Sequence, residues 1–357
     1  MAYTDIDDSS STFQNKTYSG NGSTNNITLD GNSNLSPGLV WIKSRNQSGY
    51  NHCATDVVRG ATKIIRPNLT NDEDTYANSL TSFNSNGFTL GSDSSNGEQN
   101  LSGESYISYN WKAGGSASSN SNGSITSSVS VDTTAGFSIG TFTGNATAGA
   151  TIGHGLGAAP AWILCRTISA AKDWCVYHHK NTSAPQTEVL ILNENSATTD
   201  TNDRWNDTLP GSSTFTIGDS SQLNASGGTC LFYAWTERKG YSKFGDYVGN
   251  GNANGTFVYT GFKPAWIMVK RTNSAENWYI QDDKTNILPN PALNSLMANL
   301  GNAEDTNSTG RIKDFLSNGF KLRTNDSAVN GNGDTYIYAA FAQNPFVTST
   351  GIVGLAE

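Results

Sequence analysis

The segments Trp41-Ile42-Lys43-Ser44-Arg45, Trp162-Ile163-Leu164-Cys165-Arg166 and Trp266-Ile267-Met268-Val269-Lys270 decide the fold of this chain. In each segment the residue four positions after the tryptophan is basic. Before each segment stands an aromatic residue followed closely by a Gly-Asn pair; these residues are Tyr18, Phe142 and Tyr247. Another aromatic residue closes each unit, namely Trp111, Trp235 and Phe341. The intervals from tryptophan to closing aromatic are 70 (111−41), 73 (235−162) and 75 (341−266) residues. This agreement predicts one module present in three copies.

The composition favours strands and turns over helices. Charged residues make up only 15% of the chain, whereas glycine alone accounts for 37 residues, and Ser, Thr and Asn supply most of the polarity. Ser, Thr and Asn compete for backbone hydrogen bonds, and glycine weakens helix interiors. We therefore predict an all-β protein of three tandem antiparallel β-sandwich or jelly-roll-like repeats, with a core of about 100 residues in each.

Short apolar bursts between turn residues predict hairpins within each copy. The pairs are Ala265–Val269 with Asn277–Ile280, Ala161–Cys165 with Asp173–Tyr177 and, more weakly, Leu39–Ile42 with His52–Ala54. Large aromatic residues inside such strands are expected to form the structural core, and these are Trp41, Trp162, Trp266, Trp111, Trp235 and Phe341. The copies then occupy residues 14–113, 136–238 and 239–357. Residues 1–13 form an N-terminal arm, and the Gly/Ser/Asn-rich stretch 114–135 is either a flexible linker or an extended surface segment.

The four cysteines are too few and too scattered to form a disulfide framework. Cys165 and Cys175 could face each other across the second hairpin, so they are either buried reduced thiols or one bridge. Cys230 takes the place of Tyr106 and Tyr336 in the other copies, which indicates a packing role.

Charge argues against nucleic acid as a partner, and hydropathy argues against insertion into a membrane. The net charge is −8 and the 22 basic residues form no long run, which argues against nucleic-acid binding. No stretch approaches the roughly 20 apolar residues of a membrane span, and the acidic N-terminus lacks the apolar core of a signal peptide. We therefore expect a protein made in the cytoplasm, with no membrane insertion.

Three groups of side chains are candidate binding sites. Trp174, Trp205 and Trp278 lie near turns beside Asn and Asp, as aromatic residues that stack on sugar rings do, although they could equally be structural. Acidic loops containing Asp72, Asp74, Asp200, Asp203 and Asp305 could hold calcium, or could simply carry solvated charge. The pair His178–His179 is poorly placed to chelate one ion, because neighbours on a strand point to opposite faces. We predict no catalytic residues and no other cofactor.

Several motifs resemble a repeated-domain family of structural proteins in marine tailed bacteriophages. They are the opening Met1–Asp8, Tyr18-Ser-Gly-Asn-Gly22, Leu39-Val-Trp-Ile-Lys43, the stretch Thr81–Gly91, Asn110-Trp-Lys-Ala-Gly114 and Gly153-His-Gly-Leu-Gly157. The likeness covers nearly the whole chain, although the second copy lacks the Ser-Asn-Gly turn before Phe215. That family is described mostly without a biochemical activity, so the resemblance implies a virion component and brings no catalytic residues.

The expected function is therefore a non-enzymatic virion protein, in a tail fibre or appendage, that contributes to host attachment. Its modules would stack end to end and associate as a homotrimer or another symmetric oligomer, with other virion proteins as partners. The alternatives are a glycan-binding adhesin that recognises a host surface and a capsid decoration protein.

Overall fold

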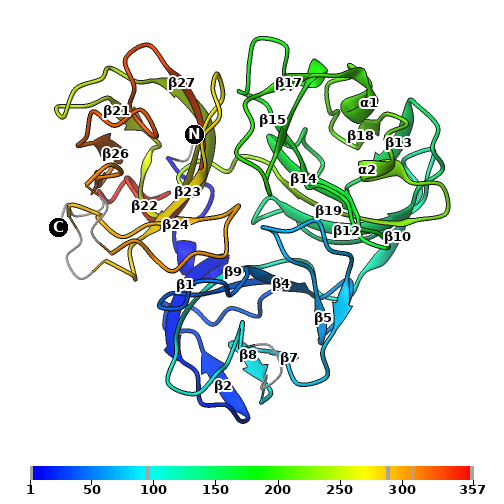
Figure 1. Ribbon diagram of the computed structural model, residues 1–357, viewed down its shortest axis with the longest axis horizontal. Helices are drawn as coiled ribbons and strands as arrows, with labels where there is room; N and C mark the ends of the chain where they lie inside the picture. Colours follow the sequence, from blue (N-terminus) through cyan, green and yellow to red (C-terminus); the bar gives the residue numbers. More distant parts are fainter. Residues whose placement is uncertain (1–2, 93–96, 287–289, 307–308, 354–357) are drawn as a thin grey trace.

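The computed structural model describes residues 3–92, 97–286, 290–306 and 309–353. These form an all-β protein of several antiparallel sheets (Figure 1). Helical structure in this part is limited to short turns: α1 (Asn202–Trp205), α2 (Ser221–Asn224) and the 3-10 helices η1 (Ser9–Ser11) and η2 (Pro185–Thr187). No helix of the described residues is long and apolar enough to cross a membrane. The predicted all-β class is confirmed.

Three principal sheets share one strand order. The first is β1-β9-β3-β4, made of Phe13–Ser19, Ser105–Trp111, Leu39–Ser44 and Cys53–Asp56. The second is β12-β19-β14-β15, made of Phe137–Thr143, Thr229–Trp235, Trp162–Thr167 and Cys175–His178. The third is β20-β27-β22-β23, made of Ser242–Val248, Thr335–Pro345, Phe262–Arg271 and Trp278–Asp282. All three hairpins predicted from the sequence are present as β3-β4, β14-β15 and β22-β23.

Short strands extend the outer ends of the principal sheets. In the second sheet β15 continues to β16 (Glu188–Ile191) and β17 (Thr199–Asp200), and in the third β23 continues to β24 (Leu296–Met297). Beside the first sheet lies the two-stranded ribbon of β5 (Lys63–Ile64) and β6 (Asp74–Thr75).

A smaller sheet covers one face of each principal sheet. These outer sheets are β2-β8-β7 (Asn25–Thr28, Gly87–Leu90, Leu80–Asn84), β13-β18 (Ala150–Gly153, Thr214–Ile217) and β21-β26-β25 (Phe257–Tyr259, Gly319–Leu322, Lys313–Leu316). In the first sheet, Val40 and Ile42 point toward the outer sheet and pack with Phe88. Leu39 and Trp41 point the other way, into the central core. Because both faces are covered, every residue of β3 and β14 is buried.

The central core is built from the closing aromatics, which meet one another. The ring centroids of Trp111, Trp235 and Phe341 lie 6.0 Å, 5.6 Å and 6.5 Å apart pairwise. Trp162 stacks on Trp235 at 4.4 Å, and Trp266 lies 5.8 Å from Trp111. All six residues predicted to form the core are buried. However, the expectation of three separate cores stacked end to end is wrong, because one cluster spans all three sheets, arranged around it as in Figure 1.

The strand register corrects the alignment of the first copy. Trp162 and Trp266 pair with the closing aromatics Trp235 and Phe341, whereas Trp111 pairs with Leu39 and not with Trp41. The structural counterpart of Arg166 and Lys270 is therefore Lys43, four residues after Leu39, and not Arg45. A shift of two residues keeps a strand side chain on the same face, so Trp41 still reaches the core.

The stretch 114–135 is an extended segment with regular structure. Within it β10 (Ser118–Asn120) and β11 (Ser127–Asp132) add to the edge of β12 and lengthen the second sheet. Between them, Ile125 forms a parallel bridge with Ile152 of β13. The segment therefore covers the edge of the second outer sheet.

Cys165 and Cys175 are direct cross-strand neighbours in β14-β15, and both are free thiols. Cys53 and Cys230 are also free and buried. Burial raises the pKa of Cys175 to about 12, so it is present as the thiol.

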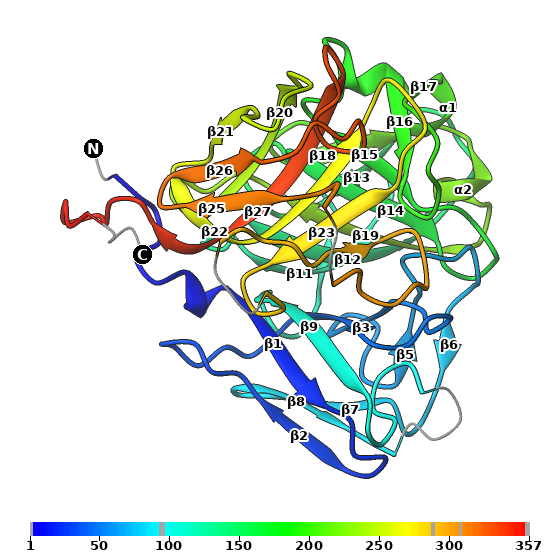
Figure 2. The ribbon, with the colours of Figure 1, turned by 60° about the vertical axis from the view of Figure 1, so that its left-hand side comes forward.

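The N-terminal arm packs against its own chain. The backbone N–H of Asp5 donates to Lys239 O at 2.9 Å, and Ile6 is buried. The carboxylate of Asp7 accepts from the backbone N–H of Ser349 at 2.6 Å, so the first and last described segments of the chain lie side by side (Figure 2).

Candidate functional site

Polar side chains concentrate where the principal sheets meet, and these three junctions are the candidate site. At each junction a ring nitrogen donates to a backbone carbonyl of the next sheet. Trp174 Nε1 donates to Arg66 O at 3.1 Å, Trp278 Nε1 to Ile191 O at 2.9 Å, and His52 Nε2 to Met297 O at 3.0 Å. The three donors occupy equivalent positions, because each lies four residues before the strand partner of Trp162, Trp266 or Leu39. Those partners are His178, Asp282 and Asp56, respectively. The contacts therefore run from sheet two to one, three to two and one to three, which closes a ring.

A backbone hydrogen bond repeats in the same cyclic way. Its members are Glu73 N to Ile168 O (2.9 Å), Thr198 N to Thr272 O (2.9 Å) and Glu304 N to Arg45 O (2.7 Å). Backbone groups that are buried at an interface must be paired, so this bond fixes the relative position of neighbouring sheets.

Buried tyrosines and aspartates join two of the three junctions. Tyr233 Oη donates to Asp56 Oδ2 at 2.8 Å, and Tyr109 Oη donates to Asp282 Oδ2 at 3.0 Å. Burial, reinforced by the aspartate charge, raises the pKa of both phenols well above the usual tyrosine value, and burial also raises the pKa of Asp282. Both tyrosines therefore stay protonated and act as donors.

The third junction is built differently at these positions. The counterpart of the two tyrosines, two residues before the closing aromatic, is Ala339, and the counterpart of the two aspartates is His178. His178 Nε2 donates instead to Tyr338 O at 3.1 Å. Burial lowers the pKa of His178 to about 3, which keeps the ring neutral.

The recurrent basic residues Lys43, Arg166 and Lys270 are fully buried. Arg166 donates to the carbonyls of Leu69 and Thr70 at 3.0 and 2.6 Å, and Lys270 Nζ donates to Asn195 O at 3.2 Å, so both reach the neighbouring sheet's loop. Burial lowers the pKa of Lys43 and of Lys270 to about 8. These cations cap carbonyl groups inside the protein and are not offered to a ligand.

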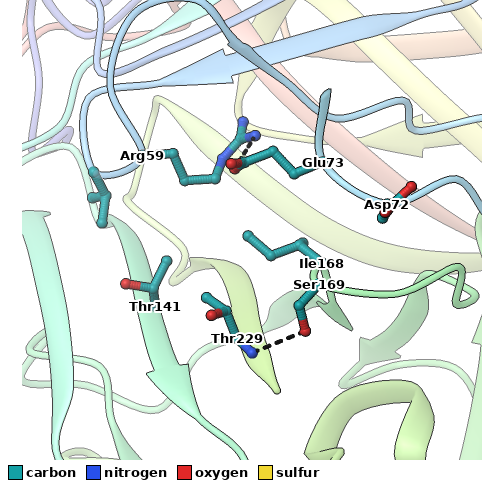
Figure 3. Close-up of a pocket in the computed structure, with 8 residues that line it drawn as sticks. Arg59, Asp72, Glu73, Thr141, Ile168, Ser169 and Thr229 are labelled. Atoms are coloured by element: carbon teal, nitrogen blue, oxygen red, sulfur yellow. Dashed lines mark hydrogen bonds and ion pairs between the residues drawn. The ribbon is translucent and has the colours of Figure 1, made fainter. Parts of the chain in front are cut away.

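The junction between the first and second sheets contains a cavity of about 360 Å³. Arg59 and Glu73 form one side, and the hydroxyl groups of Thr141, Ser169 and Thr229 lie opposite (Figure 3). The guanidinium of Arg59 is already held by Asp56 at 2.6 Å and Glu73 at 3.3 Å. Burial acts to lower the pKa of Arg59, but the neighbouring Asp56 outweighs it and keeps the pKa above the usual arginine value.

The junction between the second and third sheets contains a larger cavity of about 640 Å³. Its walls are rich in amide and hydroxyl groups, contributed by Asn181, Thr182, Ser183, Thr198, Asn273 and Thr335. A hollow of this chemistry can bind a neutral ligand with many hydroxyl groups.

A family model described as a domain of unknown function, DUF7483, matches residues 8–345. The chain belongs to the DUF7483 family. No curated protein and no solved structure matches it.

The tryptophans proposed to stack on sugars are buried in this DUF7483 chain. Trp174, Trp205 and Trp278 are each 1–2% exposed. Trp174 and Trp278 supply the junction hydrogen bonds described above, and Trp205 packs edge-on against Tyr177 in the cluster between the second principal sheet and its outer sheet. The expectation that they are exposed is therefore wrong, because the neighbouring sheet or the outer sheet covers them.

The structure does not gather the acidic residues proposed to bind calcium. Among the described residues no group of three or more His, Cys, Asp or Glu side chains could hold a metal ion. Asp74 pairs with Arg66, Asp203 with Arg204 and Asp305 with Arg311, while Asp72 lines the smaller cavity and Asp200 lies exposed in β17. The geometry of the loops therefore fits arginine pairing and not a calcium site.

All four histidines hydrogen-bond to backbone carbonyls. His179 Nε2 donates to Phe244 O at 2.6 Å, and His154 Nε2 to Gly211 O at 3.2 Å. His178 and His179 use different carbonyls, so they do not share one ligand.

Sequence analysis missed the junction tyrosines Tyr109 and Tyr233 and their partners. A signal was present, since both lie two residues before a closing tryptophan, in Tyr109-Asn-Trp111 and Tyr233-Ala-Trp235. The partners lie 173 and 177 residues away along the chain, and no local pattern connects positions so distant.

Proposed function

We propose that this chain is a structural, non-catalytic subunit of a bacteriophage virion and forms part of a tail fibre or another appendage. In this proposal each principal sheet with its outer sheet is one β-sandwich repeat of the triplicated module. The repeats occupy residues 14–113, 136–238 and 239–357. The motifs quoted above support the virion setting, and the matching strand orders of the three principal sheets support the triplication.

The observation that carries the proposal is the closed ring of junction contacts. Trp174, Trp278 and His52 each bind the neighbouring sheet at the same position in the fold, so the buried polar groups are used to build a rigid body. The histidines donate to backbone carbonyls and the buried cations cap carbonyls, which favours a scaffold over a catalyst. The resulting threefold arrangement within one chain is what a trimeric fibre protein otherwise obtains from three chains.

Partners in this proposal are other virion proteins and further copies of the chain, which together place the rigid body on the particle. Host attachment would then act through surfaces that the ring leaves open.

Immunogold electron microscopy of intact particles tests the proposal. Antibodies raised against the purified chain are applied to particles produced by the source of this sequence, with pre-immune serum as the control. Gold on fibres or tail appendages is the expected result. Labelling of the capsid lattice would indicate a decoration protein, and particles in which neither labelling nor mass spectrometry detects the chain would overturn the virion proposal.

The larger cavity favours a second candidate function, that of a glycan-binding adhesin. Its walls supply amide and hydroxyl groups beside the charged residues Lys180, Glu188 and Asp246, and all of these can hydrogen-bond to sugar hydroxyl groups. A glycan array with the purified chain tests this function, with Asn181→Ala/Asn273→Ala as the cavity variant and Asn32→Ala, which lines a different hollow, as the matched control. A sugar bound by wild type and control but not by the cavity variant would support the adhesin, and binding unaffected by the cavity variant would contradict it.

A further inference from the structure

The outer edge of β21 is the most apolar exposed surface of the third sandwich. Phe257 and Tyr259 of this strand are 43% and 60% exposed, and Val248 at the end of β20 is 54% exposed. Within the described residues, the other large hydrophobic side chains at the surface are Tyr3, Ile352 and Val353 near the chain ends and Leu209 in the second sandwich. Exposed apolar clusters on a polar protein mark interaction sites.

The other two sandwiches provide an internal comparison for these positions. Val258 pairs with Phe320 as Ile27 pairs with Phe88 and Ile152 with Phe215, so the three edge strands align. The counterparts of Phe257 are then Asn26 and Thr151, and those of Tyr259 are Thr28 and Gly153. Val248, paired with Thr335, likewise corresponds to Ser19 and Thr143. Only the third sandwich carries apolar side chains at these places.

The three edges also differ in what covers them. In the second sandwich the segment that contains Ile125 lies along β13: Ile125 N–H donates to Thr151 O at 3.1 Å, and Ser127 Oγ donates to Gly153 O at 2.7 Å. In the described part of the chain, β2 and β21 each have a single strand neighbour, β8 and β26. The exposed side chains of β2 are polar, whereas those of β21 are the aromatic rings of Phe257 and Tyr259.

The chain around β21 lacks charge and proline, two of the usual protections of an exposed edge, although β21 itself is only three residues long. Residues 249–262 contain no charged residue and no proline. Proteins normally use charges, prolines or covering segments to stop exposed edges from pairing with other chains. Their absence here, beside two exposed aromatic rings, indicates an edge that is meant to be paired.

We propose that β21 is a docking site for an extended, uncharged segment of another protein, which adds to the edge as a parallel strand. The occupant resembles Asn120–Thr126 on β13: it is rich in Ser, Thr and Asn and carries one β-branched apolar residue in the position of Ile125. Its backbone N–H groups pair with the outward carbonyl groups of β21. Its apolar side chain lies on the same face as Val258, as Ile125 lies on the face of Ile152, and the residues on either side of it lie beside Phe257 and Tyr259. The inference names a partner chemistry for the assembly role proposed above, but it depends only on the edge and would hold for a protein outside a virion.

A peptide of residues 118–130, labelled with fluorescein, is the probe, because it carries the chemistry of the segment that covers β13. Fluorescence anisotropy during titration with the intact chain is expected to show saturable binding of one peptide per chain. A peptide with Ile125→Ser should bind at least tenfold more weakly. The variant Phe257→Asn/Tyr259→Thr, which introduces the residues of β2, should weaken binding of the original peptide by at least tenfold.

Leu209→Ser is the matched control, since Leu209 is an exposed apolar residue far along the chain from β21 and should leave binding unchanged. Should the double variant misfold, a photo-crosslinking residue in place of Ile125 in the peptide gives an independent measurement, and the crosslink is expected on residues 257–259. Binding unaffected by the double variant, or crosslinks on β13, would overturn the proposal. So would a wild-type dimer in sedimentation that the double variant abolishes, because the occupant would then be a second copy. Failure of the immunogold experiment alone would leave the docking site standing.

Discussion

At the scale of single residues, two of the three junctions depend on hydrogen bonds to buried carboxylates. If the Tyr233 hydroxyl is removed, Asp56 keeps its ion pair with Arg59. If the Tyr109 hydroxyl is removed, Asp282 Oδ2 loses the hydrogen bond that it accepts from Tyr109. Losing a hydrogen bond to a buried charged group costs about 1.5–3 kcal/mol. The two junctions should therefore respond unequally to the same change.

We predict that Tyr109→Phe lowers the free energy of unfolding by roughly 2–3 kcal/mol, and Tyr233→Phe by roughly half as much. The physical reason is that Asp282 would keep only uncharged donors, namely the backbone N–H groups of Lys284 and Thr285 and the Thr285 side chain, while Asp56 keeps the Arg59 guanidinium. Urea unfolding followed by tryptophan fluorescence measures both values. Tyr259→Phe, at an exposed tyrosine, should change nothing, and equal losses at the two junctions would contradict the prediction.

Lys313 places a titratable amine in the buried interior, in β25 of the third outer sheet. It is 1% exposed and donates to Arg311 O at 3.3 Å and to the side chain of Gln281. Burial, with the charge of Arg311, lowers its pKa to about 7, well below the 10.5 of the unfolded chain. Between these values the unfolded chain binds more protons than the folded one, so the free energy of unfolding rises with pH from about 7 upward.

We predict that Lys313→Met removes part of this rise, on the order of 2 kcal/mol between pH 7 and pH 9.5. Because Lys43 and Lys270 have pKa values of about 8, the free energy of unfolding of the variant should still rise with pH, but less than that of the wild type. Urea unfolding at several pH values measures the slope. The slope decides the result, because an unpaired Gln281 lowers stability equally at every pH. A variant with the same slope as wild type would show that Lys313 does not titrate in this window.

At the scale of strands, glycine makes room for an aromatic neighbour in two of the three principal sheets. Gly140 pairs with Phe232 and Gly245 with Tyr338, and a Cβ atom at these glycines would lie 2.3 Å from the Phe232 ring and 2.6 Å from the Tyr338 ring. In the first sheet the same position is Lys16, and its partner is the small Ser108. Residue size is therefore matched across each pair.

We predict that Gly245→Ala lowers the free energy of unfolding by roughly 1–3 kcal/mol, because the Tyr338 ring must leave its position. In a Tyr338→Ser background the same substitution should cost little, as the Lys16–Ser108 pair indicates. A double-mutant cycle by chemical denaturation measures this coupling. Additive losses would mean that the ring is not what excludes the methyl group.

At the scale of the whole molecule, the shared aromatic core couples the three principal sheets. Trp111 contacts aromatic rings from the second and third principal sheets, including Trp235, Trp266 and Phe341. Separating the sheets would expose all of them, and each large aromatic buries roughly 150–250 Å². The sandwiches should therefore unfold together.

We predict a single cooperative transition in calorimetry. Trp111→Ala should lower its midpoint by about 5–10 °C without splitting it, through a cavity that costs about 3–5 kcal/mol. Hydrogen exchange distinguishes the central aromatic core from the core between one principal sheet and its outer sheet. Trp111→Ala, in the central core, should speed exchange in all three principal sheets. Trp205→Ala, equally buried but in the core of the second sandwich alone, should act mainly there. Two or more separate transitions in the wild type would contradict the prediction.

The sequence by itself determined the all-β class, the hairpins and the buried aromatic residues, because alternation along a strand and turn residues are local properties. It could not determine the pairing of Leu39 with Trp111, since strand side chains repeat every two residues and a slip of two leaves the same face buried. Nor could it show that Trp174 and Trp278 are covered, because their cover comes from the neighbouring sheet. Only the tertiary structure closed the ring, since Tyr109 and Asp282 meet through packing of whole sheets and not through any pattern along the chain.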